Sequence, residues 1–250
     1  MLTLSLIGIG CGNPDQLTLQ AVRAINAADL VLIPRKGAEK SDLAELRRAI
    51  CAQVLTNPAT RIAEFDLPVR DSDREDYRGG VDDWHDAVAS AWSREIAAHL
   101  GNKGRVAFLI WGDPSLYDSS LRVARRLDPE PAVEVIPGVT AIQALCASHA
   151  IPLNEIGQAF LVTTGRRLRE GGWPAGMETI VVMLDGGTAF EVLDPKGIQI
   201  WWGAYLGMPN QIILSGALKE VGAAIVTARA EARAEHGWIM DSYILKRALS

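Results

Sequence analysis

Mainly apolar runs of strand length alternate with amphipathic segments through the first half of the chain. Four such runs occupy residues 2–9, 30–33, 106–111 and 133–136. Helical spacing of apolar positions follows the first run, at Leu17, Ala21, Ile25 and Ala28. Further helices are predicted over residues 35–60, 84–100, 121–127 and 140–149. Alternation of strand-length runs with segments of helical periodicity indicates an α/β fold.

The second half of the chain shows a similar alternation. Predicted strands cover residues 159–163, 179–184, 198–205 and 211–215. Residues 217–235 combine alanine, glutamate and arginine as a solvent-facing helix does. Residues 238–245 fit either a strand or a short helix. We therefore expect two α/β domains, residues 1–118 and 119–250, with the boundary just after Tyr117 or within the helix that follows.

Two local features leave alternatives open. The first predicted helix begins at Asn13, with Pro14 in its first turn, or at Thr18 after a short turn, and we favour Thr18. Residues 66–83 are charged and contain glycine, which indicates a long polar loop. Such a loop is a solvated connection or a functional lid, and we favour the connection.

Composition narrows the class of protein. The 250 residues include 25 basic and 30 acidic side chains, a formal net charge of −5, which argues against a general nucleic-acid-binding protein. No apolar run reaches the length needed to cross a bilayer, and the first residues do not resemble a signal peptide. The three cysteines and four histidines show no metal-ligand spacing. We expect a cytoplasmic protein without a structural metal.

Three glycine-containing turns that follow predicted strands carry the main functional signal. They lie at residues 8–12, 112–114 and 137–140. Glycine lets the backbone turn sharply and lets a ligand touch the main chain. Three such turns at strand ends predict one small-molecule site walled by backbone.

The first turn superficially matches a dinucleotide-binding fingerprint. That fingerprint needs G-x-G-x-x-G opening directly into a helix, with an acidic residue at the end of the next strand. Here Gly12 comes one position early, and the second predicted strand is followed by Pro34 and Arg35. A nicotinamide-dependent oxidoreductase is therefore a less favoured alternative.

Taken in order, the turns and their flanks resemble the tetrapyrrole methylases, which use S-adenosylmethionine on precorrins and related rings. The matching segments are Gly8-Ile-Gly-Cys-Gly12, Pro14-Asp-Gln-Leu-Thr18, Ala28-Asp-Leu30, Gly112-Asp-Pro114 and Pro137-Gly-Val-Thr140. Residues 10–15, 77–84, 111–118, 202–207 and 237–241 are most similar to one branch of the family. That branch methylates ring carbon C1 of precorrin-5 and releases acetate, giving precorrin-6A in cobalamin biosynthesis. Cys11, where many relatives carry proline, departs from the family pattern.

The resemblance implies two α/β domains with an active-site cleft between them, assembled as a homodimer. It also implies S-adenosylmethionine as the cofactor, held largely by main-chain groups. Carried over by position, the cofactor contacts would be Cys11, Gly112, Asp113, Leu116, Thr140, Ala141 and Leu184. The residues themselves support the positions on the turns, whereas Leu184 fits equally well as a core residue at a strand end.

The implied reaction needs cations for its substrate and a base for acetyl loss. A macrocycle bearing many carboxylates favours basic partners, and we expect Arg35, Lys36 and Arg166 in that role. For any one of them, a solvated surface charge is the more common explanation. Removal of an acetyl group needs water and a base, for which the candidates are Asp15, Asp113 and Tyr117.

Three other functions remain open from the sequence besides the favoured reaction. One is a methylase of another precorrin position, or of a protein or RNA target. The second is the oxidoreductase with an atypical turn. The third is a non-enzymatic α/β binding module. The partners expected under the favoured interpretation are a small tetrapyrrole and a second copy of the chain, with no nucleic acid and no membrane.

Overall fold

The computed structural model describes residues 1–35, 41–69, 76–101 and 103–247, which fold into two compact units. The first unit ends at Thr140 and the second begins at Ala141. This boundary lies later than the one expected after residue 118. The reason is that β5 (Ala132–Ile136) pairs in parallel with β1 (Leu2–Gly8) and so belongs to the first sheet.

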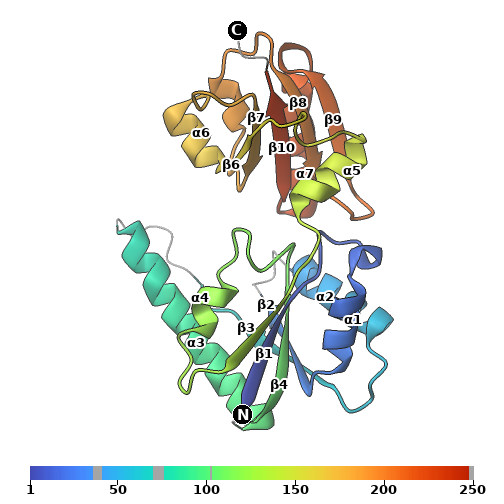
Figure 1. Cartoon of the computed structure of the whole chain (residues 1–250), viewed down its shortest axis with the longest axis vertical. Coiled ribbons are helices and arrows are strands. Elements are labelled where there is room, and N and C mark those ends of the chain that lie inside the picture. Colours follow the sequence, from blue (N-terminus) through green and yellow to red (C-terminus); the bar gives the residue numbers. More distant parts are fainter. Residues whose placement is uncertain (36–40, 70–75, 102, 248–250) are drawn as a thin grey trace. The chain divides into compact units, whose positions relative to one another are not determined.

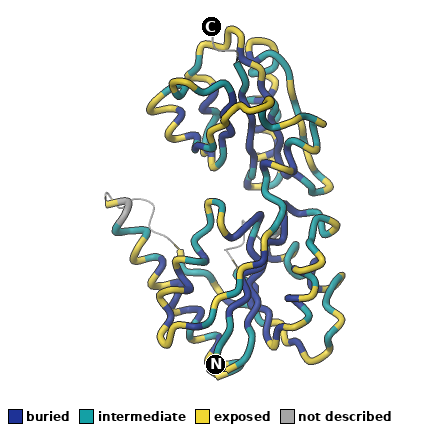
Figure 2. Tube along the Cα trace, viewed as in Figure 1, coloured by how far each residue is buried: buried dark blue, intermediate teal, exposed yellow. Residues whose placement is uncertain are grey.

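The sheet of the first unit is entirely parallel, with the strand order β3-β2-β4-β1-β5. Its remaining strands are β2 (Leu30–Arg35), β3 (Arg61–Asp66) and β4 (Gly104–Ile110). Both β1 and β4 are buried over most of their length (Figure 2), as apolar runs covered on both faces require. β2 continues through Pro34 because β4 pairs with it only as far as Leu32. Beyond that point the missing N–H of proline disrupts no ladder on that side.

Helices cover both faces of this sheet (Figure 1). One face carries α1 (Leu19–Asn26) and α2 (Ser41–Val54), and the other carries α3 (Tyr77–Leu100) and α4 (Ser120–Ala124). Side chains along β1 alternate between the two faces, so Leu4 and Leu6 pack with α3 whereas Ile7 packs with α1. The first 140 residues therefore form the α/β arrangement that the alternating pattern predicts.

The two candidate starts of the first helix are both used. Thr18 caps α1, with its Oγ1 accepting the N–H of Ala21 at 3.0 Å, which confirms the favoured prediction. Asn13 caps the preceding short 3₁₀ turn η1 (Pro14–Gln16), with its Oδ1 accepting the N–H of Asp15 at 2.9 Å. The predicted polar loop over residues 66–83 is shorter than expected, because α3 already begins at Tyr77; residues 70–75 lie outside the described part.

Three glycines meet where β1, β4 and β5 end. Because β1 lies between the other two strands, the turns that follow them must be neighbours. A Cβ atom on Gly138 would lie 2.2 Å from the carbonyl oxygen of Gly112, and one on Gly8 would lie 2.6 Å from the nitrogen of Gly138. No side chain fits at either position, so the backbone segments touch directly.

The second unit contains a mixed sheet in the order β6-β7-β10-β8-β9. Its strands are Phe160–Thr164, Thr179–Met183, Asp241–Lys246, Gln199–Ala204 and Ile212–Ala217. Only β6 and β7 are parallel; β10, the segment that the sequence left ambiguous, is the central strand and pairs antiparallel with β7 and β8. The segment is therefore a strand.

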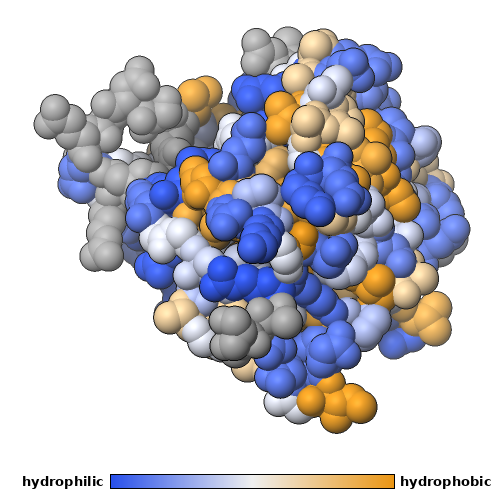
Figure 3. Space-filling view, turned by 90° about the horizontal axis from the view of Figure 1, so that it is seen from above, coloured by the Kyte–Doolittle hydropathy of each residue, from blue (hydrophilic) through white to orange (hydrophobic). Residues whose placement is uncertain are grey.

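The helices of the second unit are α5 (Ala141–His149), α6 (Gly165–Gly171) and α7 (Leu218–His236), with the 3₁₀ turn η3 (Ala189–Val192). Most of α7 is exposed, as predicted, with a buried stripe that includes Ile225 and Arg229. Within the described residues, no helix is long and apolar enough to cross a membrane. The face shown in Figure 3 mixes hydrophilic and hydrophobic side chains.

A buried polar network ties the loop that follows β7 to α6, β10 and α7. The Asp185 carboxylate accepts from Ala189 N at 2.7 Å, from the Tyr243 hydroxyl at 2.8 Å and from Arg169 Nη1 at 2.6 Å. Arg229 links the backbone carbonyl of Asp185, at 2.8 Å from Nη2, to the carboxylate of Asp241, at 3.0 Å from Nε. The loop that follows β7 is thereby fixed at several points.

The first testable consequence concerns the glycine contact. Gly138→Ala should lower the free energy of unfolding by about 1–3 kcal/mol, because the added carbon overlaps backbone that cannot rotate away. Gly171→Ala is the matched control, since nothing lies within 4 Å of its added carbon, and it should be neutral or slightly stabilising. Urea unfolding of both variants measures the difference. Equal stabilities would show that the contact is looser than described.

The second testable consequence is that the stability of the protein depends on pH through Asp185. Burial raises the pKa of Asp185, but the N–H groups of Ala189 and Gly187, the Arg169 guanidinium and the Tyr243 hydroxyl outweigh it and hold that pKa below its usual range. A depressed carboxyl pKa contributes stability above the unfolded value, which is lost as the pH falls through the folded value. Asp185→Asn should therefore cost about 2–4 kcal/mol at neutral pH.

The gap between Asp185→Asn and the parent protein should narrow below about pH 4, where the parent loses its own advantage. Urea unfolding at several pH values measures this gap. Asp194→Asn serves as the control, because Asp194 is exposed. A gap that stays constant with pH would contradict the assigned network.

Candidate active site

The three predicted turns form one continuous backbone surface in the first unit. Gly112 donates its N–H to the carbonyl of Gly10 at 2.8 Å, and Gly10 donates back to Gly112 at 3.3 Å. The third turn joins them because the Gly138 N–H donates to Asp113 Oδ2 at 2.9 Å. The Sγ atom of Cys11 lies 3.7 Å from the carbonyl oxygen of Val139. Strand order and hydrogen bonds thus bring together the turns that the sequence singled out.

Asp113 is the acidic residue that fastens the second turn to the third. Its Oδ1 accepts the N–H of Ser115 at 2.8 Å and the Ser115 hydroxyl, and its Oδ2 accepts the Gly138 N–H. Burial raises its pKa, but the Ser115 hydroxyl and the Gly138 and Ser115 N–H groups together lower that pKa below the usual value. With both oxygens engaged, the carboxylate is suited to holding the turns in place and poorly suited to accepting a further proton.

Two polar side chains line the first turn. Burial raises the pKa of the Cys11 thiol to about 12, so the thiol is neutral at physiological pH and does not act as a thiolate nucleophile. The Oε1 atom of Gln16 is buried without a hydrogen-bond partner among the described residues and lies 3.5 Å from where a Cβ of Gly10 would be. A buried, unsatisfied acceptor is costly unless a ligand pairs with it. This donor-seeking atom fits a site for a ligand with N–H or hydroxyl groups.

The other predicted residues of the first unit lie on or near these turns. Leu116 donates its N–H to the Asp113 carbonyl at 3.2 Å. Tyr117 is 45% exposed and has a φ of 51°, and Thr140 is half-buried at the end of the unit. Asp15 is exposed and lies on η1, the short helix that follows the first glycine turn.

Two predicted residues belong to the second unit. Ala141 begins α5. Leu184 follows β7 and is 63% exposed with a φ of 51°, which excludes the alternative of a core residue. A bulky side chain held at positive φ costs about 1–3 kcal/mol and is typical of functional positions. The hydrogen bonds of Asp185, the next residue, hold this strained conformation in place.

The predicted cations are spread over both units. Arg35 is exposed at the end of β2, and its Nε lies 3.0 Å from Asp66 Oδ1 at the end of β3. Lys36 lies outside the described residues. Arg166 is exposed on α6. Among the described residues, no group of His, Cys, Asp and Glu side chains is arranged to hold a metal ion.

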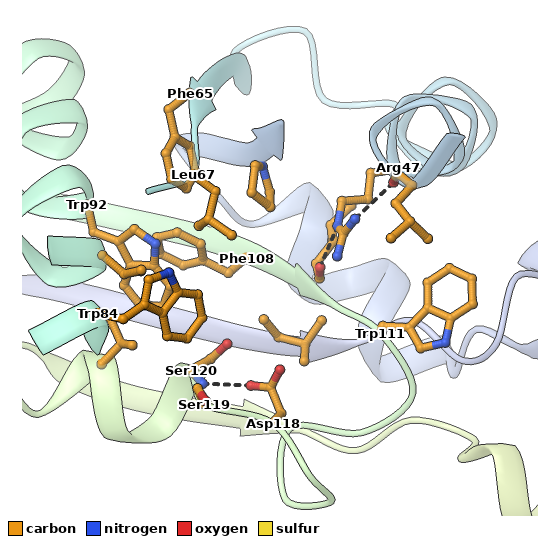
Figure 4. A pocket seen from close by; sticks show the side chains of 16 residues that line it. Arg47, Phe65, Leu67, Trp84, Trp92, Phe108, Trp111, Asp118, Ser119 and Ser120 are labelled. Atoms are coloured by element: carbon orange, nitrogen blue, oxygen red, sulfur yellow. Dashed lines mark hydrogen bonds between the residues drawn. The ribbon is translucent and has the colours of Figure 1, made fainter. Parts of the chain in front are cut away.

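Sequence reasoning missed a pocket of about 250 Å³ inside the first unit. Figure 4 shows Arg47 and Asp118 entering it from different elements, with Trp84, Trp92 and Phe108 on another wall. Arg47 lies on α2, where its position in the sequence also fits a solvent-exposed helix face. The sequence therefore did not identify it as a pocket residue. Asp118 directly follows Tyr117, one of the candidate bases. Its proximity to the second turn was the only sign in the sequence that it could belong to a site.

Comparison with known proteins places this geometry in a family. The family model of the Tetrapyrrole (Corrin/Porphyrin) Methylases matches residues 3–222. A relative from Sinorhizobium sp, Precorrin-6A synthase [deacetylating], is 48% identical over 251 aligned residues, covering 99% of this chain and 96% of the relative.

Solved structures agree with this assignment. A putative cobalamin synthesis related protein (CobF) from Corynebacterium diphtheriae superposes with a TM-score of 0.84 and 39% identity over 99% of both chains. The uroporphyrin-III C-methyl transferase from Thermus thermophilus, complexed with S-adenyl homocysteine, shares the fold with a TM-score of 0.59 at 23% identity, over 98% of this chain and 97% of the other. On these matches and its two α/β units, the chain belongs to the tetrapyrrole methylases.

Proposed function

We propose that this protein is an S-adenosylmethionine-dependent methyltransferase that methylates ring carbon C1 of precorrin-5 and releases acetate, giving precorrin-6A in cobalamin biosynthesis. The observation that carries the proposal is the joining of three glycine turns into one backbone surface. The substrate and the acetate release are supported by the 48% identity to the deacetylating relative over nearly the whole of both chains.

The residues of the turns fit a nucleoside cofactor. We assign cofactor contacts to Cys11, Gly112, Asp113, Leu116 and Thr140 in the first unit, and to Ala141 and Leu184 in the second. Gln16 adds an unpaired acceptor beside Gly10. When bound, S-adenosylmethionine supplies a methyl group already activated by its sulfonium. The protein therefore needs to position the reactants, which can supply roughly 7–11 kcal/mol of barrier lowering.

A neutral thiol and a fully hydrogen-bonded carboxylate suit this role. Because burial holds Cys11 protonated, it presents a small, uncharged surface that the activated methyl group does not alkylate. Asp113 keeps the second and third turns at a fixed separation through its hydrogen bonds. We infer that Asp113 positions the cofactor site, and that Asp15 and Tyr117 lie at its edge.

We assign substrate carboxylate binding to Arg35, Lys36 and Arg166. The ion pair of Arg35 with Asp66 is exposed on both sides, and exposed pairs contribute about 0–1 kcal/mol. A substrate carboxylate can therefore replace Asp66 at small cost, gaining the paired geometry that arginine favours. We also propose a homodimer in the cytoplasm, as the family resemblance implies, which size-exclusion chromatography and cell fractionation test.

The decisive experiment incubates the protein with S-adenosylmethionine and precorrin-5 and measures S-adenosylhomocysteine and acetate separately. Equal amounts of both products are expected. S-adenosylhomocysteine without acetate would assign the protein to another methylase of the family. Calorimetry with S-adenosylhomocysteine and NAD(H) separates both from an oxidoreductase, since only the first ligand should bind.

Leu184 offers a sharper test of the cofactor site. Leu184→Gly should leave the protein as stable or slightly more stable, because glycine adopts a φ of 51° without strain. It should weaken binding of S-adenosylhomocysteine, because an exposed apolar contact is removed. Thermal unfolding and calorimetry measure the two effects on the same sample. Unchanged affinity would remove Leu184 from the site, and Ile213→Gly, at another exposed apolar position, controls for a general surface effect.

A further inference from the structure

The pocket beside the second glycine turn shares a loop with the candidate cofactor site. Trp111 and Asp118 line the pocket and flank the turn that carries Gly112 and Asp113. Both surfaces thus include residues from the segment 111–118. A group held in the pocket would lie against the same segment that we assign to the cofactor, and the hydrogen bonds of Asp113 hold that segment in place.

The size of the pocket limits what it can accept. Its volume of about 250 Å³ is below the range of roughly 300–1,000 Å³ typical of sites for drug-sized ligands. A tetrapyrrole macrocycle does not fit in it, whereas one small substituent does. Most of the wall is aromatic or aliphatic, with Trp92 stacked on Phe108 at a ring-centroid separation of 3.9 Å. Such walls favour a group with an apolar end.

Two charged side chains, Arg47 and Asp118, face this apolar wall. Arg47 donates from Nε to the Leu109 carbonyl at 2.8 Å and from Nη1 to the Leu43 carbonyl at 2.9 Å. Its Nη2 donates to no described residue. An unpaired guanidinium donor in a small apolar pocket calls for an acceptor oxygen on the occupant.

Asp118 provides hydrogen-bond acceptors at the pocket, where Arg47 provides donors. Its Oδ1 accepts the N–H of Ser120 at 2.7 Å, which fixes the carboxylate at the start of α4. Its Oδ2 accepts no hydrogen bond from the described residues. Asp118 and Arg47 influence each other electrostatically but form no ion pair. Space is therefore left between the carboxylate of Asp118, an acceptor, and the guanidinium of Arg47, a donor. Burial lowers the pKa of Arg47 to about 10, against the opposing effect of Asp118, so the guanidinium remains charged at neutral pH.

We propose that this pocket receives the acetyl group of the substrate, that Arg47 binds its carbonyl oxygen, and that Asp118 is the base that activates the hydrolytic water. The proposal rests on the proposed function. Water adds to the acetyl carbonyl carbon while Asp118 Oδ2 takes one of its protons. The bond between that carbon and the macrocycle then breaks, and the electron pair stays on the macrocycle as the nucleophile that methyl transfer requires. Acetic acid leaves and ionises to acetate, and Asp118 and acetic acid each give one proton to solvent.

The charge arrangement favours an acetyl group over one of the substrate's own carboxylates. A carboxylate in the pocket would meet Asp118 as well as Arg47, and like charges in a confined apolar site repel. An acetyl group is neutral on entry, places its methyl on the aromatic wall and offers one oxygen to Arg47. Negative charge develops on that oxygen only during water addition, when a preplaced guanidinium stabilises it most.

Asp118 also fits the base better than the three residues first considered. Asp113 has both carboxylate oxygens occupied. Asp15 is exposed on η1, and Tyr117 is 45% exposed, so neither lies in an enclosed space with a partner for the carbonyl oxygen. Asp118 alone of the four lines the pocket.

The first test is Asp118→Asn, which keeps an oxygen for the Ser120 N–H. Acetate release from precorrin-5 should fall about 10²-fold or more, and methyl transfer should fall with it because the electron pair is not freed. Affinity for S-adenosylhomocysteine should not change. The matched control is Asp194→Asn, since Asp194 Oδ1 accepts the N–H of Lys196 two residues on, at 3.1 Å, but lies exposed outside the pocket.

The outcomes separate the two proposals. If the parent protein releases acetate and Asp118→Asn does so at the rate of Asp194→Asn, the base assignment is wrong and the proposed function stands. If the parent protein forms S-adenosylhomocysteine without acetate, both fail.

The second test needs no turnover. Saturation-transfer NMR with acetamide, a neutral compound that carries an acetyl group, should show transfer from aromatic protons of the pocket to the methyl group of acetamide. Arg47→Gln should abolish the transfer, and Asp118→Asn should preserve it because the probe carries no charge. Arg47→Lys, which keeps the charge but lacks the guanidinium N–H groups, should weaken the transfer and replaces Arg47→Gln if that variant does not fold. Transfer that is absent from the parent, or equal in the Arg47 variants, would overturn the assignment of the pocket.

Discussion

The structure of the first unit depends on a contact between bare backbone segments at the ends of three parallel strands. Gly8, Gly112 and Gly138 approach so closely that a Cβ atom on Gly8 or Gly138 would overlap a main-chain atom of a neighbouring segment. Because β1 lies between β4 and β5, this contact turns three separate loops into one surface. The reciprocal hydrogen bonds of Gly10 with Gly112 and the carboxylate of Asp113 then fix that surface. A main-chain ligand site needs such rigidity because few side chains shape it.

Asp113 and Asp118 lie on one loop, and their different surroundings give the two carboxylates different roles. Asp113 has its oxygens occupied by N–H and hydroxyl donors and stabilises the turns. Asp118, five residues later in the sequence, has one oxygen occupied and faces a small apolar pocket. In the second unit, the buried Asp185 plays a role like that of Asp113, because its hydrogen bonds fix the loop that presents the strained Leu184. Hydrogen-bond occupancy therefore separates the positioning carboxylates from the one we assign to chemistry.

The sequence predicted the features that depend on local pattern. Glycines after apolar runs located the three turns, and the capping preference of Thr18 located the start of α1. It missed features set by distant residues. The boundary between the two units lies later than predicted because β5 pairs with β1, more than a hundred positions away. The strand β3 was missed because its residues show too little alternation of apolar and polar positions. Arg47 and Asp118 meet around a pocket only once the chain has folded, so neither spacing nor composition reveals their relationship.

Hydrogen exchange with and without saturating S-adenosylhomocysteine tests the central claim most directly. If the three turns form one cofactor surface, amides in residues 8–13, 112–117 and 137–140 should become protected together on binding. The exposed N-terminal part of α7 should not change. Protection confined to one turn, or found only outside all three, would contradict the account, because a ligand held by the joined backbone must slow exchange in every segment that forms it.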